Sequence, residues 1–427
     1  MNFSEQRLFR SNREWHRQPI KHHVKGFFGG GTPSTENQEF WTNGTIPWVS
    51  SRDMKVSRLC ETQEYITNAA VSGSATNLVE PGSILIVVRS GILKHSIPVA
   101  INEVEVALNQ DIKAFVLRDT LDPEFFLYWI TGQQKDLLLE WGQLGATVDS
   151  LNIEILRNTV IPLPSPEVQR TIVSFLDRET GRIDGLIEKK TRFIALLKEK
   201  EKAAISRLVR RGLDRNAPSI DSGMDWRGRV PAHWVRGRMK DHFRQEKRQG
   251  YGDLSVLSVY REFGVIEKSS RDDNINKTPE DLSKYQLVNP KDLVINKMKA
   301  WQGSMGIARM KGITSPDYVV MRPIGEHDPR YMHHYLRAQP MPWVYRLISY
   351  GIRTDQWRME PEAFLGLPVF LPPLEEQQRI ADRIDVELER IRGLIALTER
   401  SIDLLREKRA ALITAAVTGK IDVRHAA

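Results

Sequence analysis

Residues 169–214 read QRTIVSFLDRETGRIDGLIEKKTRFIALLKEKEKAAISRLVRRGLD, and residues 378–422 read QRIADRIDVELERIRGLIALTERSIDLLREKRAALITAAVTGKID. With one single-residue gap near the start, the two stretches align in register. Identical residues recur at equivalent positions: Arg182 and Arg390, Gly185 and Gly393, Asp214 and Asp422. Solenoid repeats have a much shorter period of ~20–50 residues. We therefore expect two large equivalent units, related by a pseudo-twofold axis that the ligand shares.

Each copy of the repeat is predicted to form one long helix. Proline clusters at 161–166 and 370–373 precede the copies, and proline disfavours helix in the residue before it. In the second copy, apolar residues alternate at spacings of four and three, which is the heptad seam of paired helices. Thr398 and Arg409 fill the two missing seam positions. The first copy has a broader apolar stripe that includes Leu186. A helix of about 45 residues is roughly 65 Å long and cannot bury such a stripe alone.

The residues that we expect at the helix-pair interface are Ile183, Ile187, Ile194, Leu197, Ile384, Leu388, Ile391, Ile395, Ile402, Leu405 and Leu412.

The order of the segments is globular part, helix, globular part, helix. An antiparallel helix pair would place one globular part at each end, whereas a parallel pair would place both at the same end; we favour the antiparallel pair. Short strand-like runs (83–89, 104–108, 292–296, 318–322) mix with helical stretches (123–139, 329–347). Each globular part is therefore expected to be α+β. The globular parts also echo each other: Trp15 resembles Trp234, and Leu-Asp-Pro-Glu-Phe at 121–125 resembles His-Asp-Pro-Arg-Tyr at 327–331.

Composition restricts the class of protein. The formal net charge of +8 favours a polyanionic partner, nucleic acid ahead of a membrane surface. Cys60 is the only cysteine, which excludes an internal disulfide and a cysteine-based zinc site and fits a reducing compartment. The polar N-terminal stretch lacks the apolar region of a signal peptide, and the apolar run at 84–88 is far shorter than the ~20 residues of a membrane span. We therefore expect a cytoplasmic protein without membrane contact.

Four stretches resemble the specificity subunit of type I restriction-modification systems. Residues 221–234, DSGMDWRGRVPAHW, resemble that family's entry into a target recognition domain. Residues 30–35, GGTPST, followed by 46–54, IPWVSSRDM, resemble one class of such domains, and 292–301, DLVINKMKAW, resembles another. The proline-led openings of the two repeats resemble the family's spacer helices. The segment around Trp15 departs from the entry pattern.

The resemblance implies both an architecture and a function. Two α+β target recognition domains would alternate with two long helices that pair as an antiparallel coiled coil. The implied segments are 1–165 first recognition domain, 166–214 first spacer helix, 215–233 linker, 234–373 second recognition domain, 374–422 second spacer helix and 423–427 tail. Each recognition domain would read one half of a bipartite double-stranded DNA target. Two different half-sites are expected because the domain interiors differ.

The resemblance also implies partners. The helix pair would set the spacing between the half-sites and dock two methyltransferase subunits that methylate adenine, while motor-nuclease subunits would join for cleavage. S-adenosylmethionine, ATP and Mg would belong to those partner subunits. The chain itself would bind no cofactor or metal and carry out no catalysis.

Catalytic motifs are largely missing from the sequence. There is no G-x-x-x-x-G-K-[ST] phosphate loop. Residues 27–31, FFGGG, match the glycine turn that adenine methylases use against S-adenosylmethionine, but no Pro-Pro-aromatic catalytic turn accompanies it. We interpret this run as a loop that turns the chain or approaches DNA. The histidine pairs at 22–23 and 333–334 lack the spacing and third ligand of a metal site.

DNA contacts are expected from basic and polar side chains on loops, with solvated surface as the competing interpretation for each residue. The candidates in the first domain are Thr32, Ser34, Trp41, Ser50, Ser51, Arg52, Arg89 and Lys94. Those in the second are Arg244, Lys247, Arg248, Lys297, Lys299, Trp301 and Arg353. Lys297 and Lys299 share one strand face if the strand from Leu293 continues, which favours phosphate contact.

Two other classes of function compete with DNA reading. One is a coiled-coil interaction scaffold that does not read DNA, and the other is a stand-alone methylase or nuclease. The absence of a Pro-Pro-aromatic catalytic turn from the sequence argues against the enzyme. Salt separates a DNA reader from a scaffold, because phosphate contacts weaken steeply as salt is added.

Overall fold

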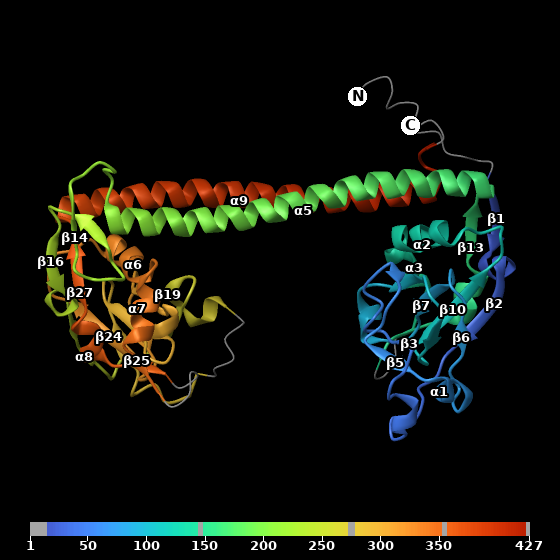
Figure 1. Cartoon of the computed structure of the whole chain (residues 1–427), viewed down its shortest axis with the longest axis horizontal. Coiled ribbons are helices and arrows are strands. Elements are labelled where there is room, and N and C mark those ends of the chain that lie inside the picture. Colours follow the sequence, from blue (N-terminus) through green and yellow to red (C-terminus); the bar gives the residue numbers. More distant parts are fainter. Residues whose placement is uncertain (1–14, 144–147, 272–277, 352–356, 424–427) are drawn as a thin grey trace. The chain divides into compact units, whose positions relative to one another are not determined.

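A computed structural model describes residues 15–143, 148–271, 278–351 and 357–423 (Figure 1). The chain divides into two compact units. The first unit contains residues 1–190 and 400–427, and the second contains 191–399. Each unit therefore holds one globular domain together with part of each long helix.

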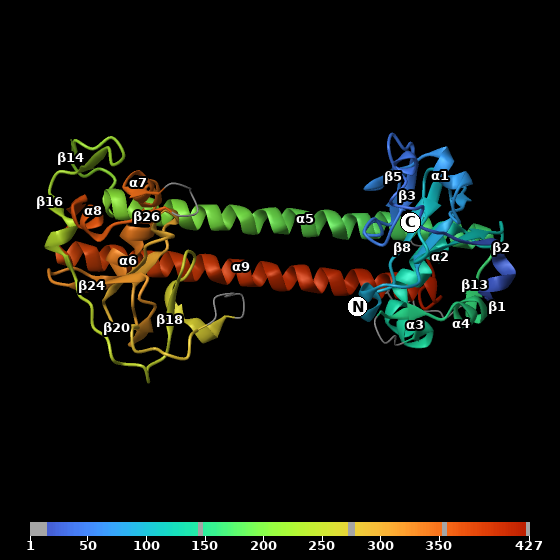
Figure 2. The ribbon, with the colours of Figure 1, turned by 90° about the horizontal axis from the view of Figure 1, so that it is seen from below.

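The two long helices are α5 (Pro166–Arg211) and α9 (Leu374–Val417). In the first unit the start of α5 packs beside the end of α9, since Leu176 shares an apolar core with Val417. In the second unit the end of α5 packs beside the start of α9, since Leu208 shares a core with Ile384 (Figures 1 and 2). The predicted antiparallel pairing is therefore confirmed within each unit.

None of the predicted interface residues is exposed. Ile183, Leu197, Ile384, Leu388, Ile391 and Ile402 are buried, whereas Ile187, Ile194, Ile395, Leu405 and Leu412 are half-buried.

The polar positions of the seam have specific partners. Thr398 is buried and donates through Oγ1 to the Leu394 carbonyl at 2.7 Å, so its hydroxyl is satisfied within the helix. Arg409 crosses to α5, where its Nε lies 2.9 Å from Oδ1 of Asp184. The sequence pattern placed Leu186 on the buried stripe. The structure does not, because Leu186 is 40% exposed.

The globular part of the first unit is built on two sheets. The larger has the strand order β2 (Val24–Gly29), β10 (Ile112–Leu117), β7 (Ile84–Val87), β8 (Val99–Asn102), β4 (Arg58–Leu59). The smaller has the order β5 (Glu64–Ile66), β3 (Ile46–Val49), β9 (Val106–Leu108), β6 (Leu78–Val79). Strand β7 is buried on both faces, so it reads as a continuous apolar run instead of an alternating one.

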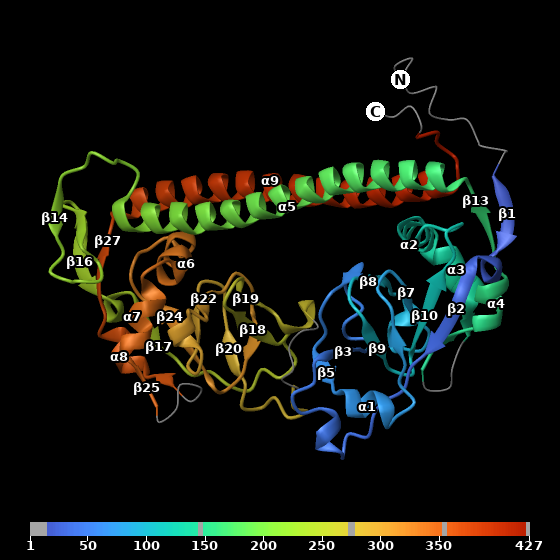
Figure 3. The same cartoon turned by 45° about the vertical axis from the view of Figure 1, so that its right-hand side comes forward.

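The larger sheet lies between two apolar layers. Ile84 and Ile86 pack with α2 (Pro123–Gly132), α3 (Gln134–Trp141) and the long helices, whereas Leu85 and Val87 pack with the smaller sheet (Figure 3). Alternate residues of a strand point to opposite faces, which explains this division.

The second unit repeats this frame. Its main sheet has the order β17 (Phe243–Gln245), β24 (Tyr318–Pro323), β21 (Leu293–Asn296), β22 (Met305–Ile307), which matches β2-β10-β7-β8. Leu293 and Ile295 pack with α6 (Pro329–Arg337) and α7 (Met341–Leu347), while Val294 packs with the hairpin of β18 (Leu257–Tyr260) and β19 (Gly264–Glu267). The predicted α+β class is confirmed, and the duplication extends to the sheets.

Each domain is joined to its outgoing long helix by an equivalent two-stranded sheet. In the first unit β1 (His16–Pro19) pairs with β13 (Val160–Leu163), which leads into α5. In the second unit β16 (Val235–Arg238) pairs with β27 (Pro368–Leu371), which leads into α9. The smaller elements are α1 (Asn68–Ser72), β11 (Gly142–Gln143), β12 (Ser150–Leu151), α4 (Ile153–Asn158), β20 (Gln286–Val288), β23 (Gly312–Thr314), β25 (Ser349–Tyr350), β26 (Arg358–Met359) and α8 (Pro361–Leu365).

Local structure differs from the sequence-based expectation in two respects. The helical stretches 123–139 and 329–347 are each two helices, because the chain leaves the helix at Gln133 and again between α6 and α7, ahead of Pro340. The segment 215–233 is not a plain linker. It contains the hairpin of β14 (Ser219–Asp221) and β15 (Arg229–Pro231), with Arg227 buried between them and the domain.

Candidate nucleic-acid interface

One edge of the larger sheet in the first unit gathers most of the predicted contacts. The ends of β2 and β7 meet the start of β10 there, since Gly29 lies opposite Lys113 and Val87 opposite Ile112. The turn at 109–111 forms the centre of this edge. Thr32 Oγ1 donates to Gln110 Oε1 at 2.6 Å, and the Asn109 amide donates to the Val49 carbonyl at 3.0 Å.

The same turn also fixes the chain that follows β7. The Val88 amide donates to the Asp111 carbonyl at 2.8 Å, which places Arg89 at this edge. Ser50 Oγ donates to Asp53 Oδ2 at 2.8 Å and so holds the turn that carries Arg52. The structure therefore brings the segments of Thr32, Arg52 and Arg89 together around one turn, although they are far apart in sequence.

The predicted residues differ in exposure. Thr32, Ser34, Arg52, Arg89 and Lys94 are exposed, whereas Trp41, Ser50 and Ser51 are half-buried.

Trp41 is a loop anchor. Its Nε1 donates to the Ser34 carbonyl at 3.0 Å, and its ring packs edge-on against Trp48 with 5.2 Å between centroids. These contacts hold the loop that carries Ser34. The cations and hydroxyls, more than this ring, are therefore the groups that the edge presents to a ligand.

The glycine run at the end of β2 has a packing role. A Cβ on Gly30 would lie 1.9 Å from the Leu108 carbonyl oxygen, and the Gly31 amide donates to that same oxygen at 3.0 Å. The loop can approach the end of β9 this closely only without a side chain at position 30. Glycine here positions the Thr32 loop on the sheet.

The matching edge of the second sheet carries a second group of candidates. Asn296, at the end of β21, lies opposite Tyr318 at the start of β24, and Lys297, Lys299 and Trp301 follow directly. The strand ends at Asn296, so the condition under which Lys297 and Lys299 would share a strand face is not met. Asn296 caps a turn instead, with its carbonyl accepting from the Lys299 amide at 3.1 Å.

This turn is supported by neighbouring aromatic rings. Trp301 Nε1 donates to the Met298 carbonyl at 3.1 Å, and its ring lies 6.0 Å from that of Trp357. Trp301 is half-buried, Lys299 is exposed, and Lys297 is half-buried. Lys247, which follows β17, is exposed at the same edge.

Two further candidates do not present their charge at this edge. Arg248 Nη2 contacts Asp292 Oδ2 at 2.6 Å, and Asp292 is a buried carboxyl whose pKa burial raises, so Arg248 serves the fold. Arg244 lies opposite Arg322, away from this edge. Arg353 lies outside the described residues.

Sequence reasoning missed several residues at these edges. In the first unit they are Gln110, which is exposed and bonded to Thr32, and Lys113 on β10. In the second unit Arg358 is exposed beside the lysine turn, since the next amide, that of Met359, donates to the Lys297 carbonyl at 3.2 Å. The Asn-Gln-Asp run at 109–111 was the available signal, because such residues favour turns between strands.

Buried glutamines join each domain to its helix in the same way. Gln169 Nε2 donates to the carbonyls of Thr120 and Pro164 at 3.0 and 2.8 Å, and its Oε1 accepts from the Asp122 amide at 2.8 Å. In the second unit Gln377 Nε2 donates to the Pro372 carbonyl at 2.9 Å, and its Oε1 accepts from the Asp328 amide at 3.0 Å.

The aspartates in these contacts also have equivalent roles. Asp122 is the N-cap of α2 and Asp328 is the N-cap of α6. Because Gln169 matches Gln377, the two repeats align there at the same offset of 208 (377 minus 169) that relates Arg182 to Arg390. The single-residue gap introduced to match Gln169 with Gln378 is therefore wrong.

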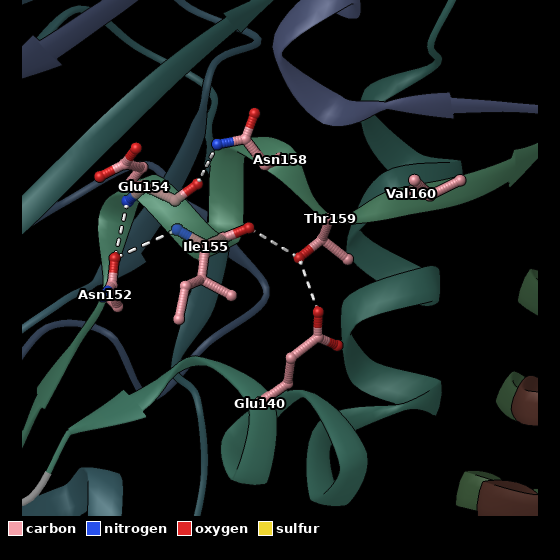
Figure 4. A pocket seen from close by; sticks show the side chains of 7 residues that line it. All are labelled: Glu140, Asn152, Glu154, Ile155, Asn158, Thr159 and Val160. Carbon is pink, nitrogen blue, oxygen red and sulfur yellow. Dashed lines mark hydrogen bonds between the residues drawn. The ribbon is translucent and has the colours of Figure 1, made fainter.

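A cavity of about 570 Å³ in the first unit has an acidic lining (Figure 4). It is formed by Glu140, Asn152, Glu154, Ile155, Asn158, Thr159 and Val160. Thr159 Oγ1 accepts from Trp141 Nε1 at 2.8 Å and lies 3.3 Å from Glu140 Oε1. The two carboxylates make this face unsuitable for a phosphate backbone, in contrast to the sheet edge.

Sites for metal chemistry are not apparent in the described ranges. No group of three or more His, Cys, Asp or Glu residues there could hold a metal ion. His23 is buried with Nδ1 2.8 Å from Thr120 Oγ1, and burial lowers its pKa, as expected for a structural histidine. Among the residues that the structure describes, no helix is sufficiently long and apolar to cross a membrane.

Comparison with known proteins gives a consistent family. Residues 23–194 match the family described as type I restriction modification DNA specificity domain. The chain is 36% identical over 170 residues to the EcoR124I/EcoR124II specificity subunit of Escherichia coli, a match that covers 40% of this chain and 42% of that protein. It is 25% identical over 312 residues to the MjaVIII specificity subunit of Methanocaldococcus jannaschii, covering 68% and 69% respectively.

Solved structures extend the likeness of fold to nearly the whole chain. A chain from a structural study of complex assembly in the type I restriction-modification system aligns with a TM-score of 0.66 at 15% identity, covering 96% of this chain and 99% of that one. The specificity subunit of Thermoanaerobacter tengcongensis aligns with a TM-score of 0.55 at 14% identity, covering 96% and 98%. Residues 23–194 therefore match the type I restriction DNA specificity domain in sequence, and almost the whole chain shares the fold of these solved type I restriction-modification chains.

Proposed function

We propose that this chain selects a bipartite target in double-stranded DNA, each globular domain reading one half. The observation that carries the proposal is the equivalent sheet edge in the two units. Both edges expose cations and polar groups on loops, Arg52 and Arg89 in the first and Lys247 and Lys299 in the second. Hydroxyl, amide and guanidinium groups on loops are suited to base edges and phosphates. The loops differ in sequence, so the half-sites differ.

The long helices offer a reason to expect two copies of one partner. In the first unit Leu186 of α5 and Leu404 of α9 are exposed. In the second unit their equivalents at the offset of 208, Leu394 of α9 and Leu196 of α5, are exposed as well. Exposed leucines that recur on both units fit two equivalent docking surfaces, which we assign to two methyltransferase subunits.

Catalysis would reside in those partners. Adenine methylation with S-adenosylmethionine would belong to the methyltransferase subunits, and ATP- and Mg-dependent cleavage to motor-nuclease subunits. The missing phosphate loop and missing methylase turn in this sequence support this division. Such a complex would act on DNA in the cytoplasm.

The function is tested by mapping methylated adenines across the host genome with and without this chain. The expected result is that one split motif, methylated on both strands, disappears when the chain is absent. Changing Lys299 to Ala should weaken or relax only one half of that motif, and Arg52→Ala only the other. A motif with two identical halves would refute two different readers, and an unchanged methylome would refute the assignment.

The partner arrangement is tested by stoichiometry. Leu196→Glu should remove one of two methyltransferase subunits in a purified complex, because a buried carboxylate is costly at an apolar contact. Leu139, which is 86% exposed and belongs to α3 instead of a long helix, provides the matched control as Leu139→Glu. Two bound subunits in both variants would contradict docking at the leucines.

A further inference from the structure

A groove of about 550 Å³ at the C-terminal end of α5 is lined by four arginines. These are Arg207, Arg210, Arg211 and Arg215, together with Ala203, Ser206 and Gly212, and we call this surface the basic groove. Positions three and four apart lie on the same face of a helix, so Arg207, Arg210 and Arg211 share one side of α5, and Arg215 follows just after the helix ends. All lining residues belong to the second unit.

The positive charge of the basic groove lacks a matching carboxylate. Among the described residues, no Asp or Glu forms an ion pair with any of the four arginines. Glu376 lies beside Gly212, but its Oε2 is 2.7 Å from His233 Nε2. Like charges three and four residues apart on a helix repel each other, so this arrangement is unfavourable without an anion.

A fifth arginine deepens the positive potential. Arg227 is 2% exposed, and its Nη2 points to the carbonyl oxygens of Val209 and Phe370 at 3.5 and 3.4 Å. Its partners are therefore neutral. Arg210 Nη2 donates to the Arg227 carbonyl at 2.9 Å, which joins the buried arginine to the groove. Burial, followed by the charges of Arg227 and Arg211, lowers the pKa of Arg210.

An alternative explanation is that the arginines only stabilise the end of α5. The end of α9, the other long helix, allows this explanation to be tested within the same chain. At the offset of 208, the four positions are occupied in α9 and its extension by Ala415, Thr418, Gly419 and Val423. The last turn of α9 has no basic residue, yet α9 ends normally. Both helices are followed by a glycine with φ near +70°, Gly212 and Gly419. Helix termination therefore does not require the arginines.

We propose that the basic groove binds the phosphate backbone of the duplex, adding sequence-independent affinity on only one of the two units. This inference rests on the proposed function. Guanidinium groups form paired hydrogen bonds with phosphate oxygens. The four arginines of the groove are available for such contacts because no Asp or Glu among the described residues forms an ion pair with them. The helical part of the groove, 203–211, extends about 12 Å, a length over which duplex DNA carries roughly seven phosphate charges. The complex would thus hold DNA more tightly on the side of the second half-site.

The test is the salt dependence of DNA binding by the full chain. Binding to a duplex with the mapped motif, and to one with both halves scrambled, is measured over a range of salt concentrations. Each lost phosphate contact should reduce the slope of log affinity against log salt by about 0.9, so R207Q/R211Q should reduce it by about 1.8. Between 50 and 200 mM salt, the unaltered chain should then lose about 12-fold more affinity than the variant. The ratio of motif to scrambled affinity should stay constant.

The matched control removes two exposed lysines near the end of the other helix, Lys408 within α9 and Lys420 just after it, as K408Q/K420Q. It changes the net charge by the same amount and should reduce the slope much less. Equal slopes for R207Q/R211Q and the unaltered chain would overturn the inference, as would equal effects of the two double variants. R215Q, which lies beyond the helix, should reduce the slope by about half as much as the double variant and excludes a helix effect. An unaltered chain without DNA affinity would refute the proposed function itself.

Discussion

The buried glutamine at the start of α9 allows a sharp test of how each domain is held on its helix. Gln377 is 3% exposed and bridges the Asp328 amide and the Pro372 carbonyl. Gln377→Ala leaves both buried backbone groups without a partner. Each such group costs about 1–3 kcal/mol, so the junction should lose about 2–6 kcal/mol of stability.

The next residue supplies the control. Gln378 is the same residue type on the same helix turn, but it is exposed. Gln378→Ala changes helix propensity by the same amount as Gln377→Ala and should alter stability by less than about 0.5 kcal/mol. The difference between the variants therefore isolates the two hydrogen bonds.

Native-state hydrogen exchange is the appropriate assay, because a chain with two units does not unfold in a single two-state step. Amides of α6 and β27 should lose at least about 30-fold in protection in Gln377→Ala, which corresponds to 2 kcal/mol. The equivalent Gln169→Ala should have the same effect on α2 and β13 only. Similar protection in Gln377→Ala and Gln378→Ala would refute the bridging role.

Two other perturbations test specific contacts. Gly30→Ala should destabilise the first unit by about 1–3 kcal/mol, because its Cβ would meet the carbonyl at the end of β9, whereas Gly91→Ala, with open space around it, should change the melting temperature little. Burial lowers the pKa of His327 to about 4, with the His242 charge as the next cause. The unfolded chain then binds the extra proton, so up to about 3 kcal/mol of stability is present above pH ~6.5 and is lost as the pH falls towards 4. In denaturation measured against pH, His327→Gln should reduce this loss of stability at acid pH. An unchanged loss would contradict the role of His327. The control is His95→Gln, because His95 is exposed.

The sequence predicted the frame better than the site. Heptad spacing and proline clusters were sufficient to predict α5 and α9, because the apolar stripe of a long amphipathic helix repeats along its entire length. Leu186 was misassigned, since an apolar residue at a helix surface can serve either the helix partner or another protein. Candidate contacts were harder to predict, because the edge that unites Thr32, Arg52 and Arg89 depends on strand order, which periodicity does not reveal.

The register of the repeats shows the same limit on a smaller scale. The Gln-Arg dipeptides at 169–170 and 378–379 are identical in letters, yet the side chains with equivalent contacts are those of Gln169 and Gln377. Burial separates Gln377 from the exposed Gln378. Matching sequence letters alone therefore aligned Gln169 with the exposed Gln378. The shared hydrogen-bond partners align it with the buried Gln377 instead.

Duplication and divergence are divided in a way that fits the proposed function. The elements that join each domain to its helix are equivalent in the two units: the glutamine bridge, the aspartate N-cap and the two-stranded sheet. The loops at the sheet edges differ, and so do the helix ends, where one has four arginines and the other has none in its last turn. A duplicated frame holds each reader on its helix in the same way, whereas reading different half-sites requires different loops. The basic groove adds an asymmetry that a symmetric frame does not need, and a steeper salt dependence that is lost with Arg207 and Arg211 would give that asymmetry a physical role in orienting the complex on DNA.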